Sequence, residues 1–376
     1  MATETNRKIA LTNADSWLGC CTAYHLAQKL EEKCEELELV CLARKPELLD
    51  KLKKFKNVRI EKVDYDDEKT LDKVLRGVTC VLLIPENDEN RVQCAKSILT
   101  TMKNAQIKSC MMISVEGAGE ASHLKELQSY REIEKEVEQY QCYLILRKSI
   151  LNQCFLLWTH VVREQAKFPI STSKQSELAP IDMCDLVCAI ETLVVEHCRH
   201  GEIIVAPSST QQQPEGNGDQ QTEAQDLEGF GSHKNKTYTL TGPQQVTPER
   251  IAQDLSEITG KQIEVKEVDR EELKRYFESL RERENWSEDI DADWCQRLLD
   301  NALITGTNDD HNGEHDGDHI APNEAAINLF LDELELVGKG GAGFVSGDLE
   351  KIIGHPGRSI KDFLQKEKDA FKPHRD

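Results

Sequence analysis

The feature that most constrains the fold is an alternation of strand-like and helix-like segments over residues 7–150. Short apolar runs of strand length recur at Lys8–Leu11, Leu37–Leu42, Val58–Lys62, Cys80–Ile84, Ser109–Ser114 and Cys142–Arg147. Segments with helical spacing lie between them, for example at Pro46–Phe55, Glu68–Leu75 and Glu89–Asn104. Strands that alternate with helices form parallel sheets, because each helix carries the chain back across the sheet. The sequence therefore predicts an α/β fold with a doubly wound parallel sheet.

The remainder of the chain continues this mixed pattern. Residues 151–204 predict a helix, a short strand and a second helix around Leu186–His197. After residue 235, a strand and a turn precede a helix over Pro248–Ile258, with Thr247 as its N-cap and proline at its first position. We predict a doubly wound domain over residues 7–160. A smaller C-terminal α/β part over residues 161–376 completes the sheet and its cleft.

Two polar stretches interrupt the C-terminal part, at residues 206–235 and 305–322. Both are poor in core-forming residues, so we predict disordered insertions at both. The second contains His311, His315 and His319 among acidic residues. A flexible loop loses conformational entropy when it holds an ion, so a solvated acidic linker is preferred over a metal site, and no metal is predicted.

The charge is strongly negative and unevenly distributed. The formal net charge is −21, with 28 basic and 31 acidic residues in 1–200 (net −3) and 19 basic and 37 acidic residues in 201–376 (net −18). This balance argues against direct binding to nucleic acid or to an anionic membrane surface. It also suits electrostatic attraction to a basic protein partner, although the acidity is equally explained by solubility.

The cysteines indicate a reducing compartment. There are 13 of them, scattered and without a CxxC pair. Cys184 and Cys188 lie one helical turn apart and are interpreted as a structural pair rather than a redox couple. No signal peptide and no stretch of membrane length is evident. We expect a soluble protein of the cytoplasm, with the nucleus as a further location.

The stretch LTNADSWLGCC follows the first predicted strand and opens a helix, which is where a dinucleotide-binding turn lies in a Rossmann-type sheet. On a GxxGxxG spacing the three glycine positions are Asn13, Ser16 and Gly19. Asparagine tolerates a left-handed backbone, and the last glycine is kept. Ser16 places a Cβ where phosphates approach the backbone. Asp15 adds a carboxylate that would cap the helix itself and repel a pyrophosphate. Nucleotide binding and a purely structural cap both remain open.

The end of the second strand favours a phosphorylated cofactor. Its sequence is CLARKPELL, so Arg44 and Lys45 stand where an NAD site usually carries an acidic residue for the ribose. Two cations at this position suit the 2′-phosphate of NADP(H). The alternative is that both are ordinary solvated residues on a loop.

With these residues in view, the chain resembles the NmrA-like family, atypical members of the short-chain dehydrogenase/reductase superfamily. The matching stretches run in family order outside the two insertions, and include LTNADSWLG, VCLARKPELLDKL, NVRIEKVDYDDEKTLDKVLRGVTCVLLIPE, KNAQIKSCMMISVEGAG, YLILRKSIL, APIDMCDLVCAIETLV, TYTLTGPQQVTPERIAQDLSEITG and GDLEKIIGHPGRSIKDFL. The resemblance implies a Rossmann NAD(P)-binding-like domain with a smaller C-terminal part around a ligand cleft.

The resemblance also implies site residues. It places Asp64 near the adenine and Ile84, Pro85 and Ser114 along the cofactor groove. Together with the turn, the candidate cofactor-binding residues are Thr12, Asn13, Asp15, Ser16, Trp17, Leu18, Gly19, Arg44, Lys45, Asp64, Ile84, Pro85 and Ser114. The expected cofactor is NADP(H), bound weakly or lost because of the altered turn.

The expected proton-transfer residues are absent from their usual spacing. Reductases of the wider superfamily carry Tyr with Lys four residues later, where the lysine lowers the tyrosine pKa. Here Tyr130, the nearest candidate, is followed at that spacing by Glu134, and Lys135 lies on another helix face. A carboxylate beside Tyr130 would raise its pKa, so the sequence predicts a catalytically disabled site with no catalytic residue.

Two functions are consistent with these residues. The resemblance covers NADP-sensing regulators of transcription factors and NADPH-dependent reductases. The altered spacing favours a non-catalytic NADP sensor or pseudo-enzyme that acts through a protein partner, such as a transcription regulator or another basic protein. The alternative is an NADPH-dependent reductase of a small carbonyl, enone or quinone.

Overall fold

The computed structural model describes residues 7–33, 37–119, 123–200, 229–280, 286–287, 319–320 and 322–372. Seven strands form the main sheet in the order β3-β2-β1-β4-β5-β6-β8, and every neighbouring pair is parallel. Their bounds are β1 Arg7–Leu11, β2 Leu37–Ala43, β3 Val58–Lys62, β4 Cys80–Leu83, β5 Ser109–Val115, β6 Cys142–Lys148 and β8 Lys236–Leu240. This confirms the predicted Rossmann-type α/β class.

The strand order reverses between β1 and β4, which are hydrogen-bonded neighbours although two strands separate them in the chain. Helices after β1 and β4 therefore leave on opposite faces, and a crevice opens beyond the carboxyl ends of these strands. Open α/β sheets bind their ligands at such a crossover point. The fold thus places the LTNADSWLG turn at the position where a ligand is expected.

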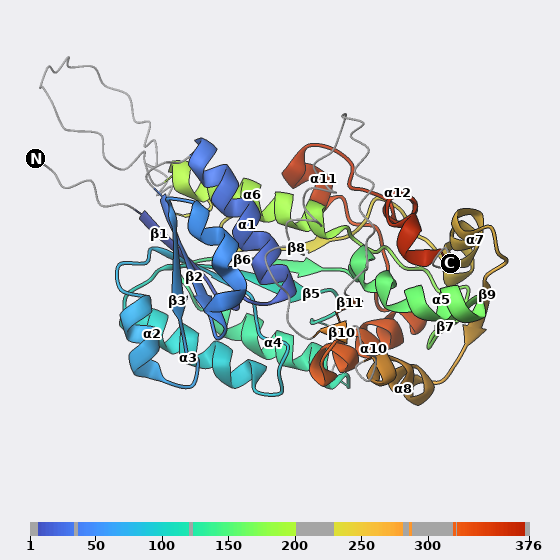
Figure 1. The fold of residues 1–376 in the computed structure, drawn as a ribbon. Coiled ribbons are helices and arrows are strands. Elements are labelled where there is room, and N and C mark those ends of the chain that lie inside the picture. Colours follow the sequence, from blue (N-terminus) through green and yellow to red (C-terminus); the bar gives the residue numbers. More distant parts are fainter. Residues whose placement is uncertain are drawn as a thin grey trace, which may run out of the picture.

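Helices cover both faces of the sheet, as Figure 1 shows. On one face α1 (Trp17–Lys33) packs against α6 (Met183–His200), and α6 packs in turn on α11 (Asp348–Ile353). On the other face lie α2 (Glu68–Val74), α3 (Arg91–Asn104) and α4 (Lys125–Val137). The 3₁₀ segment η1 (Pro46–Lys54) connects β2 to β3, where a helix over Pro46–Phe55 was predicted. The inner strands β2, β4 and β5 are largely buried and apolar, whereas the edge strands β3 and β8 are partly exposed and more polar.

The C-terminal part adds a second, smaller sheet, in which β7 (Lys167–Ile170) pairs with β9 (Glu264–Glu267). Around it lie helices that pack on one another and on α4. Their bounds are α5 Thr159–Gln165, α7 Pro248–Thr259, α8 Arg270–Leu280, α10 Glu324–Gly338 and α12 Ile360–Lys366. Two 3₁₀ segments lie beside these helices, η2 Asn152–Trp158 and η4 Lys368–Phe371, while η3 Gly231–His233 packs on α6. The hydrophobic core beneath α2–α4 continues into this part without interruption.

An aromatic cluster centred on Trp158 joins the two parts. Its fully buried indole stacks on Phe155 and meets Phe168, Phe277 and Phe330 at ring-centroid distances of 5.1–5.7 Å. The indole Nε1 donates to the carbonyl oxygen of Pro169 at 2.6 Å, so its polar atom is satisfied inside the core. Rings from η2, β7, α8 and α10 thus fix the position of α10 over the end of the sheet.

The observed elements confirm most of the predicted ones. All six predicted strands are present within two residues at each end, and Thr247 caps α7 by accepting a hydrogen bond from Arg250 N. The first predicted insertion extends too far, because residues 229–235 are ordered and Phe230 is buried against the ring of His197. Residues 206–228 lie outside the described residues.

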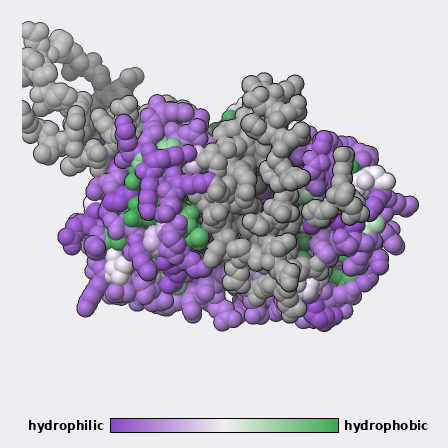
Figure 2. Space-filling view, viewed as in Figure 1, coloured by the Kyte–Doolittle hydropathy of each residue, from purple (hydrophilic) through white to green (hydrophobic). Residues whose placement is uncertain are grey.

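The second predicted insertion, 305–322, is described at only a few positions. Strand β11 (His319–Ile320) pairs with β10 (Trp286–Ser287), and Pro322 precedes the N-cap of α10. His311 and His315 fall outside the described residues. Among the described helices, none is long and apolar enough to cross a bilayer. Figure 2 shows hydrophilic residues over most of the coloured surface on this face.

Candidate functional site

A pocket of about 480 Å³ lies along the carboxyl ends of the central strands. One end is formed by the turn after β1 and the loop after β2. The other end lies between β5, β6, α4 and α10. Its walls include Asn13, Ser16, Arg44, Ile84, Pro85, Ser114, Tyr130, Lys148, Phe277, Phe330 and Glu333. A volume of this size suits a small-molecule site.

The turn after β1 has the backbone of a dinucleotide turn without two of its glycines. Asn13 adopts φ 51°, the left-handed conformation that was predicted for it. Its backbone N–H donates to the Tyr65 hydroxyl at 2.7 Å. A Cβ on Gly19 would lie 2.0 Å from the carbonyl oxygen of Asn13, so glycine is required where α1 meets the turn.

The helix cap is made by Ser16 rather than by Asp15, contrary to the prediction. The Ser16 hydroxyl accepts from Gly19 N–H at 3.1 Å and donates to the Asn13 carbonyl at 2.7 Å. The Asp15 carboxylate instead accepts from the backbone N–H of Lys45 at 2.7 Å and ties the turn to the end of β2. Burial raises the pKa of Asp15, although the Lys45 N–H opposes this. Asp15 still contributes a carboxylate to the pocket wall.

Arg44 lies at the pocket wall, as a ribose-phosphate contact requires, but acidic side chains surround it. Its Nε and Nη2 donate to both oxygens of Glu86, at 2.7 and 3.0 Å. Its Nη1 lies 3.4 Å from Asp64, and its Nη2 lies 3.8 Å from Asp66. The hydrogen bonds to Glu86 raise the pKa of Arg44 above its already high value. The guanidinium is therefore permanently charged and largely neutralised by its neighbours.

At the other end of the pocket a lysine and a glutamate pair in an apolar setting. Lys148, the last residue of β6, places Nζ 2.9 Å from Oε1 of Glu333 on α10. Burial alone would lower the pKa of Lys148, but the attraction of Glu333 outweighs it and holds the pKa above its usual value. Tyr130 lines the same end, and its interaction with Lys148 acts in the same direction. A protonated amine thus faces a pocket that also holds a phenol.

Glu134 does not act on Tyr130 in the way that the spacing suggested. Its carboxylate is fully buried and accepts from Arg147 Nε and Nη2, both at 2.8 Å, and from the Ser114 hydroxyl at 2.7 Å. Burial opposes its ionisation, but Arg147 and Ser114 lower its pKa below the usual value. The charge of Glu134 is thus balanced by Arg147, while no lysine stands four residues after Tyr130.

The structure brings most of the predicted cofactor residues together. Ten of them line the pocket, namely Asn13, Asp15, Ser16, Trp17, Leu18, Arg44, Lys45, Ile84, Pro85 and Ser114. Three do not. Thr12 is buried and its hydroxyl bonds Ile84 N and O, which ties β1 to β4. Gly19 serves helix packing, and Asp64 is exposed beside Arg44.

Among the pocket residues that were not predicted from the sequence, three carry the charges discussed here. Lys148 ends β6 and Glu86 lies shortly after β4, which is a usable signal because ligands bind at the carboxyl ends of such strands. Glu333 is a buried acidic residue in the apolar helix INLFLDELELV, and it could have been singled out as a charge in need of a partner.

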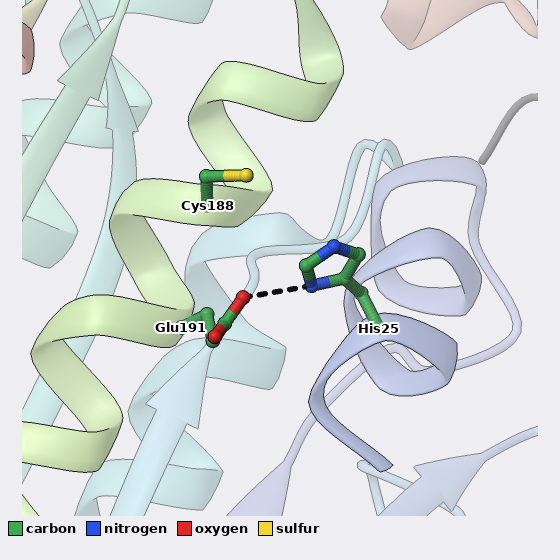
Figure 3. A group of neighbouring side chains, drawn as sticks. All are labelled: His25, Cys188 and Glu191. Atoms are coloured by element: carbon green, nitrogen blue, oxygen red, sulfur yellow. Dashed lines mark ion pairs between the residues drawn. The ribbon is translucent and has the colours of Figure 1, made fainter. Parts of the chain in front are cut away.

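A second polar cluster lies outside the pocket. Figure 3 shows His25 of α1 facing Glu191 of α6, with Cys188 one helical turn away. His25 Nδ1 is 3.2 Å from Glu191 Oε2, and the potential ligand atoms of the three lie within 4.8 Å of one another. Burial raises the pKa of the Cys188 thiol to about 11, so it is protonated at neutral pH. The cluster links α1 to α6, and the free thiols of Cys184 and Cys188 fit the predicted structural role.

Comparisons with known proteins agree with the fold. Residues 21–178 match the NAD(P)H-binding family. No curated protein matches the sequence. Among solved structures, the NADPH-dependent quinone oxidoreductase QOR2 of Escherichia coli, complexed with NADPH, is similar with a TM-score of 0.66 and 19% identity, over 95% of this chain and 98% of that chain.

Two further structures show the same fold. The triphenylmethane reductase of Citrobacter sp., complexed with NADP(H), has a TM-score of 0.65 and 19% identity, over 96% of this chain and 99% of that one. A nucleoside-diphosphate-sugar epimerase of Staphylococcus aureus has a TM-score of 0.65 and 13% identity, over 95% and 99%. These likenesses confirm the Rossmann-type fold.

Proposed function

We propose that this chain, whose residues 21–178 match the NAD(P)H-binding family, is an NADP(H)-dependent reductase of a small apolar carbonyl, enone or quinone. The observation that carries the proposal is a pocket with a dinucleotide turn at one end and the Lys148–Glu333 pair beside Tyr130 at the other. The known proteins of similar fold include reductases complexed with NADPH or NADP(H), which supports the same cofactor here.

The residues present fit the cofactor at most positions. The left-handed backbone of Asn13 and the small Gly19 let the chain turn sharply at the start of α1, where a pyrophosphate would lie. Arg44 stands where a 2′-phosphate would lie, although Glu86 and Asp64 oppose the phosphate there. The proposed binding of NADP(H) is therefore weak, because acidic side chains already occupy the donors of Arg44.

The residues at the Lys148 end of the pocket can supply the proton that a reduction requires. When bound, NADPH supplies a hydride. Lys148 holds a proton at Nζ inside the pocket and can give it to an oxygen that gains negative charge, after which solvent returns the proton. Glu333 keeps this ammonium charged, and Tyr130 offers a hydroxyl at the same end. A cation held in an apolar pocket also stabilises such an oxygen more strongly than water does.

The walls indicate the substrate class. Around the Lys148 end the pocket is lined by apolar and aromatic side chains, namely Leu151, Leu156, Leu157, Phe277, Leu329 and Phe330. These surfaces favour a planar, uncharged acceptor with one polar oxygen rather than a sugar or a charged acid. Quinones and enones fit this description.

The test is NADPH oxidation in the presence of quinones and enones, compared between the wild type and Lys148→Met. The substitution keeps the length of the side chain and removes its proton. We expect acceptor-dependent turnover that falls about 100-fold or more in the variant, with little change in NADPH affinity. Lys135→Met, which removes an exposed lysine of α4, is the matched control. Wild-type rates at background would contradict the proposal.

A second candidate is an NADP-sensing regulator without turnover, supported by one observation. The polar groups of the turn already bond within the protein, through Ser16 to Gly19, Asp15 to Lys45 and Arg44 to Glu86. Such a turn suits a site that responds to cofactor concentration. The test is retention of a basic transcription regulator at low and moderate salt, with and without NADPH. Retention that does not change with NADPH would contradict a sensor.

A further inference from the structure

Arg44 and Glu86, which both line the pocket, form an ion pair with two hydrogen bonds. The guanidinium Nε lies 2.7 Å from Oε1 of Glu86, and Nη2 lies 3.0 Å from Oε2. Both oxygens of the carboxylate thus accept hydrogen bonds from the same edge of the guanidinium. This paired geometry is the one by which arginine also binds a phosphate, so the two acids would compete for the same donors.

Glu86 is fixed more firmly than the other acids around Arg44. Its side chain is only 12% exposed, whereas those of Asp64 and Asp66 are 60% and 59% exposed and are screened by water. Its backbone carbonyl accepts from Arg91 Nε at 2.7 Å, and the buried Arg91 is bonded in turn to Glu126 at 2.7 Å. The carboxylate is therefore held on a rigid loop at the pocket wall.

We propose that Glu86 sets the dinucleotide selectivity of this chain by competing with a 2′-phosphate for Arg44. The inference rests on the nucleotide pocket of the proposed function and names the residue that weakens NADP(H) binding there. A 2′-phosphate can reach Arg44 only by displacing Glu86 or by sharing the guanidinium with it at close range. An unphosphorylated ribose neither displaces Glu86 nor shares Arg44 with it. The site is therefore expected to distinguish poorly between NADP(H) and NAD(H).

The test uses Glu86→Gln, which keeps the shape of the side chain and removes its charge. Calorimetry measures the binding of adenosine 2′,5′-bisphosphate and of adenosine 5′-monophosphate, two probes that lack the nicotinamide. We expect the preference for the bisphosphate to rise about tenfold or more, because one negative charge beside the phosphate is gone. Glu89→Gln, an equal charge change on the exposed part of the same loop, should leave the preference unchanged.

The gain must also depend on Arg44. In an Arg44→Gln background, Glu86→Gln should no longer raise the preference for the bisphosphate. Glu86→Ala repeats the measurement if the glutamine variant is unstable, as judged by thermal unfolding. An unchanged preference in the folded variants, a gain that persists without Arg44, or a strong preference for the bisphosphate in the wild type would each overturn the inference. Failure of bisphosphate binding in every variant would overturn it too, whereas the reductase proposal is decided separately by acceptor-dependent turnover.

Discussion

Nζ of Lys148 lies 2.9 Å from Oε1 of Glu333, although 185 positions separate the two residues in the chain. The lysine ends a central strand of the sheet, and the glutamate lies on α10 of the C-terminal part. Their pairing places a charged group inside an otherwise apolar end of the pocket. The relationship therefore joins the two parts of the fold at the point where a substrate is proposed to react.

Removing the carboxylate tests this relationship through pH. In Glu333→Gln, burial acts on Lys148 without the main opposing charge, so the pKa of the lysine should fall. The protonated amine is then lost at lower pH, and the alkaline limb of the kcat profile should move down by about one pH unit or more. An unshifted profile in a folded variant would show that Glu333 does not maintain the charge of Lys148.

A second prediction concerns the helix cap of the turn. Ser16→Gly removes the hydroxyl that bonds Gly19 N–H, and frees this N–H for a phosphate. We expect tighter NADPH binding, by about threefold to tenfold, with a loss of only a few tenths of a kcal/mol in stability, as is usual when glycine replaces a serine cap. Calorimetry and denaturant unfolding measure the two effects. Weaker binding would mean that the hydroxyl itself contacts the cofactor.

A third prediction concerns stability between pH 4 and 7. Burial raises the pKa of Asp185 to about 6, although it accepts a hydrogen bond from Arg358 N at 2.6 Å. The folded protein therefore favours the protonated acid, and the stability it contributes is present below pH 4 and lost as the pH rises through about 6.

Asp185→Asn keeps an acceptor for Arg358 and removes this ionisation. The variant should gain on the order of 2 kcal/mol in unfolding free energy at pH 7 relative to the wild type, and little at pH 4. Denaturant unfolding across this range provides the measurement. Parallel curves for the two proteins would rule out Asp185 as the source of the pH dependence.

Much of the fold could be predicted from the sequence because short contiguous segments determine most of its elements. Each central strand is a short apolar run, and the segments on either side have apolar residues at helical spacing. The turn after β1 is a contiguous motif. The spacing of the turn identified the positions of Asn13 and Gly19, and residue type made a left-handed Asn13 acceptable. The end of the first insertion did not, because Phe230 is a single apolar residue among polar ones, and only its contacts in the core show its role.

The chemistry of the site was harder to predict because it depends on pairs that the fold brings together. The sequence suggested that Arg44 had no acidic partner. Arg44 follows β2 and Glu86 follows β4, and the two meet because both strands lie next to β1 in the sheet. Glu134 looked like a neighbour of Tyr130 because helical spacing does not reveal Arg147 on the adjacent strand. Glu333, the partner of Lys148, lies on α10, 185 positions further along the chain, so no local sequence pattern predicts the pair.

The central claim is that this pocket binds NADPH across the turn after β1. Its most direct test is a calorimetric titration of NADPH into the wild type and Gly19→Ala, with Gly347→Ala as a control whose added Cβ meets nothing closer than 3.9 Å. In Gly19→Ala the new Cβ would lie 2.0 Å from the Asn13 carbonyl, so the turn must open. We predict saturable one-site binding in the wild type and the control, and its loss in Gly19→Ala with the fold retained by circular dichroism. Binding that is absent from the wild type at millimolar NADPH, or unaffected by Gly19→Ala, would contradict the account.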